Sequence, residues 1–249
     1  FNTMNWTRSG VSTVYIDHEI IPRGMQAGIY DQEGKRCAAQ PVSSRSDGTY
    51  WAVWMDDIPA FGYKKYSIRP YEKSSSLTET GTGEVLENQW YRIVTDHARG
   101  TIISLFDKEL SLELADGASQ YGIGEFILEQ LGNRSQMESR MLNDFSRSPL
   151  DTVWFDSFAT DEIWNSIKFC GESETFTGPR GFTFEIRLYN TEKRIDFAYS
   201  AVKKSITDPE SFYLAFPFVL KEGKHFTEVA GGVIETGIEQ IPGSSNDWY

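Results

Sequence analysis

The stretch LENQWYRIVTDHARGTIISLFDKELSLELAD, residues 86–116, decides the fold class of this chain. Strand-forming side chains alternate along residues 90–95 and again along residues 102–107, with the period of two that a half-buried β-strand has. Between these segments lies DHARG, residues 96–100, whose glycine is typical of a tight turn. The pattern predicts a β-hairpin with His97 in a structural position in its turn.

The rest of the chain also carries strand-like segments, separated by turns rich in Gly, Pro, Asp and Ser. Residues 1–71 predict a small β-sandwich from short candidates: Val11–Ile16, Gly24–Tyr30, Thr49–Met55 and Tyr63–Ile68. Residues 72–84, EKSSSLTETGTGE, are polar and read as a linker. Residues 85–249 predict a large antiparallel sandwich from longer candidates: Thr101–Phe106, Phe126–Gln130, Phe182–Leu188, Arg194–Val202 and Phe212–Leu220. With one short helix expected around Met137–Asn143, the chain as a whole is predicted to be all-β.

The charge of the chain and the shortness of its apolar runs argue against some classes of partner. The 249 residues include 24 basic and 36 acidic side chains, giving a formal net charge of −12 and a pI near 4.8. Nucleic-acid binding needs clustered Lys and Arg, so no nucleic-acid partner is expected. No apolar run approaches the roughly 20 residues of a membrane span, and no targeting segment is visible. We therefore expect a soluble protein without a membrane partner, and the sequence leaves its compartment open.

Residues with catalytic or metal-binding chemistry are sparse. The only histidines are His18, His97 and His225, and none has a second histidine at the spacing of metal ligands. Cys37 and Cys170 are far apart and predict two separate thiols, although a single disulfide stays open. No pair among the 36 acids stands out as a glycosidase pair, and no nucleophile elbow or phosphate loop is present. The sequence therefore predicts no catalytic residue, metal site or cofactor in this chain.

The best candidate for a ligand contact is the segment Glu239–Tyr249. It combines amide and carboxylate groups with adjacent aromatic rings, and such planar hydrogen-bonding groups beside an aromatic face suit a sugar. The predicted substrate-binding residues are Gln240, Asn246, Asp247 and Trp248. The alternative is a polar loop that a single Trp anchors to the core.

Five segments resemble, in the same order, segments of the β region of the family 38 glycoside hydrolases, the α-mannosidases. Residues 1–10 resemble the family's FN-x-x-x-W-x-R-x-G pattern, and residues 58–63, IPAFGY, resemble its v-P-a-x-G-y segment. Residues 86–116 resemble the start of its large sandwich, through LEN-x-x-Y-R, I-x-S-L-x-D-K and E-L. Residues 211–218, SFYLAFPF, resemble its y-x-a-F-P-F strand, and residues 240–247, QIPGSSND, its Q-x-P-G-S-x-x-D loop. Each motif is short, so the resemblance depends on their shared order.

The resemblance implies both a fold and a parent activity. The fold is a small β-sandwich followed by a large supersandwich of the galactose-mutarotase type, truncated at its C-terminal end because the family's later segments are missing. The activity is that of a hydrolase that removes terminal α-mannosides with retention of configuration. In the family the zinc ligands and the carboxylate nucleophile lie in an N-terminal α/β domain, to which nothing in this sequence corresponds. We therefore expect an inactive accessory region whose partners are the catalytic zinc domain of the same polypeptide and the α-mannoside substrate.

Two other functions remain open at this point. A stand-alone carbohydrate-binding β-module would have the same composition and strand pattern. An aldose-epimerase-like enzyme would share the type of large sandwich, but it needs a positioned acid and base, usually His with a carboxylate. His97 and His225 are the only histidines in that half of the chain, and neither lies in a motif typical of mutarotases.

Overall fold

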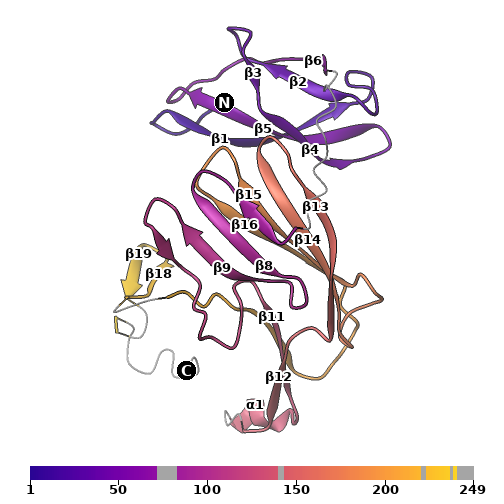
Figure 1. Ribbon diagram of the computed structural model, residues 1–249, viewed down its shortest axis with the longest axis vertical. Helices are drawn as coiled ribbons and strands as arrows, with labels where there is room; N and C mark the ends of the chain where they lie inside the picture. The colour runs from indigo at the N-terminus through magenta and orange to yellow at the C-terminus, as the bar shows by residue number, and fades with distance from the viewer. Residues whose placement is uncertain (72–82, 140–142, 220–222, 236–237, 240–249) are drawn as a thin grey trace. The chain divides into compact units, whose positions relative to one another are not determined.

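The computed structural model describes residues 1–71, 83–139, 143–219, 223–235 and 238–239 (Figure 1). Its regular structure is almost entirely β, in several antiparallel sheets, with one short helix among the described residues. The all-β sandwich class predicted from the sequence is thus confirmed. No helix in these residues is long and apolar enough to cross a membrane. Residues 72–82 of the predicted linker lie outside the described residues.

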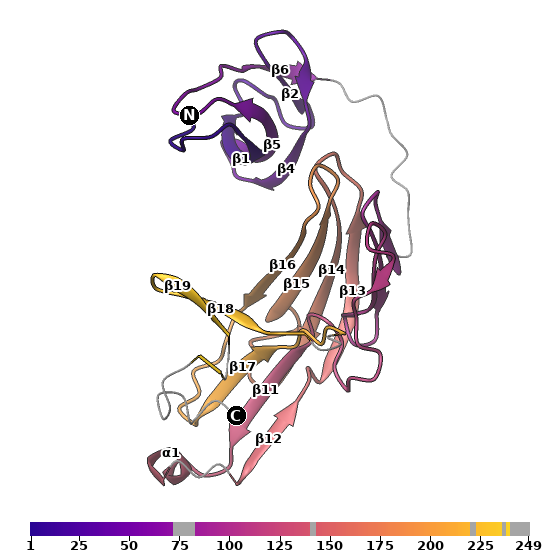
Figure 2. The same ribbon diagram turned by 90° about the vertical axis from the view of Figure 1, so that its left-hand side faces the viewer.

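Two three-stranded sheets form the N-terminal sandwich, and Figure 2 shows them as two layers. The first sheet has the order β1-β5-β4, with strands at Arg8–Asp17 (β1), Gly48–Ile58 (β5) and Ala39–Ser44 (β4). The second has the order β3-β2-β6, with strands at Arg36–Cys37 (β3), Gln26–Tyr30 (β2) and Ser67–Tyr71 (β6). Alternate side chains of both sheets meet in one apolar core that includes Ile16, Ile29, Trp51 and Val53. The small sandwich therefore has a core of its own.

The hairpin predicted from the opening stretch is present. β8 (Tyr91–Asp96) and β9 (Thr101–Asp107) pair antiparallel, with a bulge between Val94 and Thr95. Gly100 closes the turn by donating from its N–H to Asp96 O at 2.7 Å, and its φ of 62° is a left-handed conformation that glycine adopts without strain. The sheet order is β10-β9-β8-β7, with β10 at Leu112–Glu113 and β7 at Val85–Glu87.

Three further sheets complete the described structure. One has the order β13-β14-β15-β16, with strands at Thr152–Ala159, Trp164–Glu172, Phe182–Tyr189 and Ile195–Ala201. Another has the order β12-β11-β17, with strands at Phe145–Ser148, Phe126–Leu131 and Glu210–Leu214. The third is the hairpin of β18 (Phe226–Val229) and β19 (Gly232–Glu235). The helix α1 spans Ser135–Ser139 and lies beside the end of β11 in both views.

Several predicted boundaries differ from the structure, and three of the differences have a clear physical reason. β6 begins at Ser67 rather than at Tyr63, because its register is set by antiparallel pairing along the whole of β2. The strand predicted at Phe212–Leu220 ends as β17 at Leu214, since Pro217 has no N–H to donate to a neighbouring strand. The helix begins two positions before the predicted Met137, where the side chain of Asn133 accepts a hydrogen bond from the Ser135 amide at 2.9 Å and caps it. Among the strands that were not predicted are β4, β12, β13, β14, β18 and β19.

The chain packs into two compact units, which we describe separately. The first comprises Phe1–Trp90, Phe155–Phe169 and Phe184–Tyr199, and the second comprises Tyr91–Trp154, Cys170–Thr183 and Ser200–Tyr249. The small sandwich thus lies in the first unit together with segments from later in the chain.

Many of the aromatic side chains are core residues. In the first unit Phe184 stacks on Phe169 and on Tyr199, with centroid distances of 5.0 and 5.8 Å. Burial raises the pKa of the Tyr199 hydroxyl. In the second unit Phe126 contacts Phe176 edge to face at 5.5 Å. These rings pack on one another, so they are not free to stack on a sugar.

A polar joint ties the small sandwich to the β13–β14 turn within the first unit. Gln40, which is 3 % exposed, accepts hydrogen bonds through Oε1 from the amides of Ile163 and Trp164 at 2.8 and 2.9 Å. Glu162 accepts from Arg36 Nη2 at 2.9 Å, and its second oxygen accepts from a backbone amide of β4 at 3.1 Å. The joint satisfies backbone groups that the strands leave unpaired, which is a structural role.

Candidate functional site

The predicted substrate-binding residues Gln240, Asn246, Asp247 and Trp248 lie outside the described residues. Among the residues that the structure does describe, no group of three or more His, Cys, Asp or Glu could hold a metal ion. Cys37 and Cys170 are not joined in a disulfide. His97 lies in the β8–β9 turn as predicted, and His225 is exposed just before β18.

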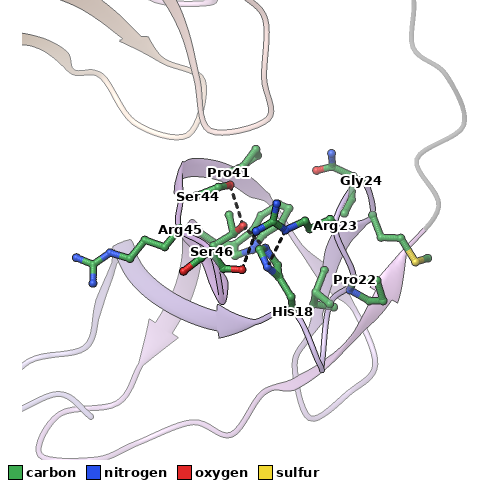
Figure 3. Close-up of a pocket in the computed structure, with 13 residues that line it drawn as sticks. His18, Pro22, Arg23, Gly24, Pro41, Ser44, Arg45 and Ser46 are labelled. Carbon is green, nitrogen blue, oxygen red and sulfur yellow. Dashed lines mark hydrogen bonds between the residues drawn. The ribbon is translucent and has the colours of Figure 1, made fainter.

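The small sandwich contains a pocket of about 650 Å³ (Figure 3). Its walls are the loop between β1 and β2 and the turn of the β4–β5 hairpin. His18 and Arg23 come from the loop, Ser44 and Thr49 come from the hairpin, and Trp51 of β5 also lines the pocket. A volume of this size lies within the range of small-molecule sites.

Local backbone chemistry fixes both walls. In the first wall, Met25 N donates to Pro22 O at 3.1 Å and closes a turn. In the second, Arg45 N donates to Gly48 O at 2.7 Å across the hairpin turn. A Cβ at Gly48 would lie 2.5 Å from the ring of Tyr15, so only glycine lets the two strands approach this closely. The sequence expectation of turns at these places is therefore confirmed.

A chain of side-chain hydrogen bonds joins the two walls, and Figure 3 draws it with dashed lines. Arg23 donates from Nη2 to Ser46 O at 2.7 Å and from Nε to His18 Nδ1 at 3.4 Å. His18 Nε2 lies 3.2 Å from Thr49 Oγ1, which lies 2.9 Å from Ser44 Oγ. Both imidazole nitrogens are therefore engaged in holding the walls together, so His18 is not free to act as a base.

The charges around the pocket are unevenly distributed. Arg23 points between the walls, whereas Arg45 points away from them and lies over the ring of Tyr50 at 5.1 Å (Figure 3). Asp47 follows directly in the same turn but is not a lining residue. Its hydrogen bond with the Tyr15 hydroxyl lowers the pKa of the Asp47 carboxyl and raises the pKa of Tyr15 to about 12. The Asp47 carboxylate is thus directed to Tyr15.

The arrangement suits binding rather than catalysis. Arginine, hydroxyl and indole groups lie beside apolar side chains, and the described lining contains no Asp or Glu that could act as an acid or base. Sequence reasoning missed this site because its residues lie in two turns that look ordinary one by one. The antiparallel registers of Ile16 and Ser44 with Thr49 bring the turns together, and only a correct strand pairing could have shown this.

In comparisons with known proteins, no family model matches the chain, and no curated protein matches it.

Proposed function

We propose that the chain is an accessory β region of a retaining α-mannosidase, in which the catalytic zinc domain is a different part of the polypeptide. The support is structural: motifs that resemble the α-mannosidase family, although far apart in the sequence, contact one another. Asn2 of the FN motif is 4 % exposed and donates from Nδ2 to the carbonyls of Ile58 and Pro59, both at 3.1 Å. Asn2 N also donates to Gly62 O at 2.8 Å. The first motif is thus bound to the second, and this observation carries the proposal.

A second pair of motifs also meets. Ala115, at the end of the opening stretch, forms an antiparallel bridge with Phe218 of the SFYLAFPF segment. Asp116 N donates to Pro217 O at 2.9 Å in the same place. Both contacts lie within the second unit.

Polar residues of the segment 86–116 have structural partners as well. Asn88 donates from Nδ2 to Tyr189 O at 2.6 Å, and Asp107 accepts from the Glu109 amide at 3.0 Å. Glu113 accepts from Ser104 Oγ at 2.6 Å and from a backbone amide of β9 at 2.7 Å. Such contacts are typical of a scaffold, because each side chain holds backbone in place rather than facing a ligand.

The role that follows is to hold and position a catalytic domain. Enzymes gain rate when reacting groups are kept in a fixed geometry, and loops achieve this when rigid elements support them. A β-sandwich with its own core provides such support. In this proposal, the second half of the chain is a supersandwich of the galactose-mutarotase type.

The test compares two proteins: the chain alone, and the chain together with the polypeptide that its gene encodes upstream. Both are assayed with an aryl α-mannoside, with zinc and with a chelator. We expect turnover only from the longer protein, and only with zinc. Zinc-dependent turnover by the chain alone, or an upstream sequence without an H-x-D zinc motif, would reject the proposal.

A stand-alone carbohydrate-binding module is the second candidate, and the pocket of the small sandwich is the observation that favours it. Calorimetry of the chain alone with mannose oligosaccharides separates the two candidates. A binding module should release or take up heat with a saturable isotherm, whereas a scaffold should not.

A further inference from the structure

We propose that the pocket between the β1–β2 loop and the β4–β5 turn binds a small organic anion through its carboxylate, sulfate or phosphate group. This inference does not depend on the α-mannosidase proposal, since none of the pocket residues belongs to the motifs that carry the resemblance. Hydrogen-bond donors without acceptors, apolar walls and the local balance of charge support it.

Arg23 provides the charge and the first donors. Its Nε and Nη2 atoms are fixed by His18 and by the Ser46 carbonyl. Its Nη1 has no hydrogen-bond partner in the described part of the chain, so two of its N–H groups are available. A guanidinium held at one edge presents its other edge in a fixed direction, which is the geometry that recognises an oxyanion.

The hydrogen-bond chain orients a second donor. Because Arg23 Nε can only donate, His18 Nδ1 must accept, and the neutral ring carries its proton on Nε2. His18 Nε2 then donates to Thr49 Oγ1, and the Thr49 and Ser44 hydroxyl oxygens lie 2.9 Å apart, where either hydroxyl can donate to the other. When Thr49 is the donor of this pair, the Ser44 hydroxyl can donate its own proton to a ligand.

Trp51 provides an independent observation. Its side chain lines the pocket and is 3 % exposed, and its Nε1–H has no hydrogen-bond partner among the described residues. Leaving a buried donor unpaired is unfavourable, so this N–H favours the entry of an acceptor.

The walls determine the rest of the ligand. Ile21, Pro22, Met25 and Pro41 contribute apolar surface to the lining. The volume of about 650 Å³ is far larger than one oxyanion, so the remaining space fits an organic body of about the size of a sugar ring. An acidic or phosphorylated sugar has both parts.

Charge also distinguishes this pocket from its surroundings. The chain has 36 acidic against 24 basic residues, yet the described lining holds Arg23 and Arg45 and no carboxylate. In an acidic protein, a surface with two arginines and no carboxylate attracts anions that the rest of the surface repels.

The experiment measures binding to the whole chain by calorimetry, with glucuronate, glucose 6-phosphate, glucose and inorganic phosphate as probes. We expect the two anionic sugars to bind at least about tenfold more tightly than glucose or inorganic phosphate, with affinity falling as salt is added. Equal affinity for glucuronate and glucose would reject the oxyanion. Equal affinity for inorganic phosphate and glucose 6-phosphate would reject the organic body. A specific site should bind with a dissociation constant of roughly 1 mM or lower. If neither anionic sugar binds when it is added in about 10-fold excess over protein at roughly 1 mM, the site is rejected.

Two variants and a matched control locate the binding. Arg23→Gln should weaken binding of the anionic sugars about tenfold or more, and Ser44→Ala should weaken it several-fold. Arg8→Gln removes one exposed arginine of the same sheet outside the pocket and should change the affinity less than twofold, apart from the general effect of charge. If Arg23→Gln and Arg8→Gln weaken binding equally, the anion is held by net charge and the proposal is wrong. Ser44→Ala decides the question if Arg23→Gln unfolds the loop, because it leaves Arg23 and His18 in place.

Discussion

Replacement of Asn2 tests whether the FN motif has a structural role. Its side chain donates to the carbonyls of Trp6, Ile58 and Pro59 at 2.7, 3.1 and 3.1 Å, and accepts from the Met4 amide at 3.0 Å. The two amide hydrogens can make two full hydrogen bonds, which the three carbonyls share, and the amide oxygen accepts one more. The side chain therefore contributes about three net hydrogen bonds. At about 1 kcal/mol each, Asn2→Ala should lower the free energy of unfolding by about 3 kcal/mol. That is a large fraction of a typical domain stability of about 5–15 kcal/mol.

The assay is urea unfolding followed by tryptophan fluorescence, and two further variants sharpen it. Asn2→Asp keeps the acceptor but turns a carboxylate oxygen towards three carbonyls, so it should cost at least as much as Asn2→Ala. Asn5→Ala changes an exposed asparagine of the same segment and should stay within about 0.5 kcal/mol of the parent. The reasoning fails if Asn2→Ala is as stable as Asn5→Ala, or if Asn2→Asp is as stable as the parent.

Three other measurements test the structure elsewhere. Gln40→Leu leaves two buried amides without an acceptor and should cost about 2–4 kcal/mol in urea unfolding, whereas Gln32→Leu on the surface should cost less than about 0.5 kcal/mol. Burial opposes ionisation of Glu113, but hydrogen bonds from Ser104 and from backbone amides outweigh it and lower its pKa. The stability that Glu113 contributes is therefore present above the ordinary glutamate pKa of about 4.3, and it is lost as pH falls through the lower pKa of the folded state. In unfolding measured from pH 5 to 2, Glu113→Gln should make the free energy of unfolding fall less steeply with decreasing pH. Burial raises the pKa of Cys37, so iodoacetamide should label it slowly at pH 7 and faster as pH rises, and buried Cys170 should stay unlabelled until the chain unfolds.

The sequence predicted those elements whose local signal agrees with their final burial. Residues 90–107 alternate along both strands, and the structure buries Ile93 and Leu105 while leaving Arg92 and Ile103 exposed. The strand Phe182–Tyr189 alternates in the same way, with Phe182, Phe184, Ile186 and Leu188 buried. Period and burial coincide there, so pattern reading succeeds.

Strand β14 shows why the rest was missed. Its sequence WNSIKFCGE interrupts the apolar positions with Asn, Ser and Lys, so neither a period of two nor one of 3.6 stands out. In the structure, Ser166 and Gly171 are buried along with Ile167 and Phe169, because the strand is interior to its sheet and covered on both faces. Burial of this kind depends on tertiary neighbours that no local window contains.

The candidate pocket and the family resemblance concern different residues. The motif residues Asn2, Asn88 and Glu113 all bind backbone groups, and such roles describe how a β-sandwich is held together. Arg23 and Ser44 lie outside the motifs, and Arg23 retains N–H donors that have no partner among the residues described. Because a fold hosts many functions and loops carry the differences, a shared scaffold says nothing about what those donors meet. The two proposals can therefore fail separately. A chain that binds glucuronate but belongs to no zinc hydrolase would keep the pocket and lose the parent enzyme, and a chain that supports α-mannosidase turnover without binding an anion would do the reverse.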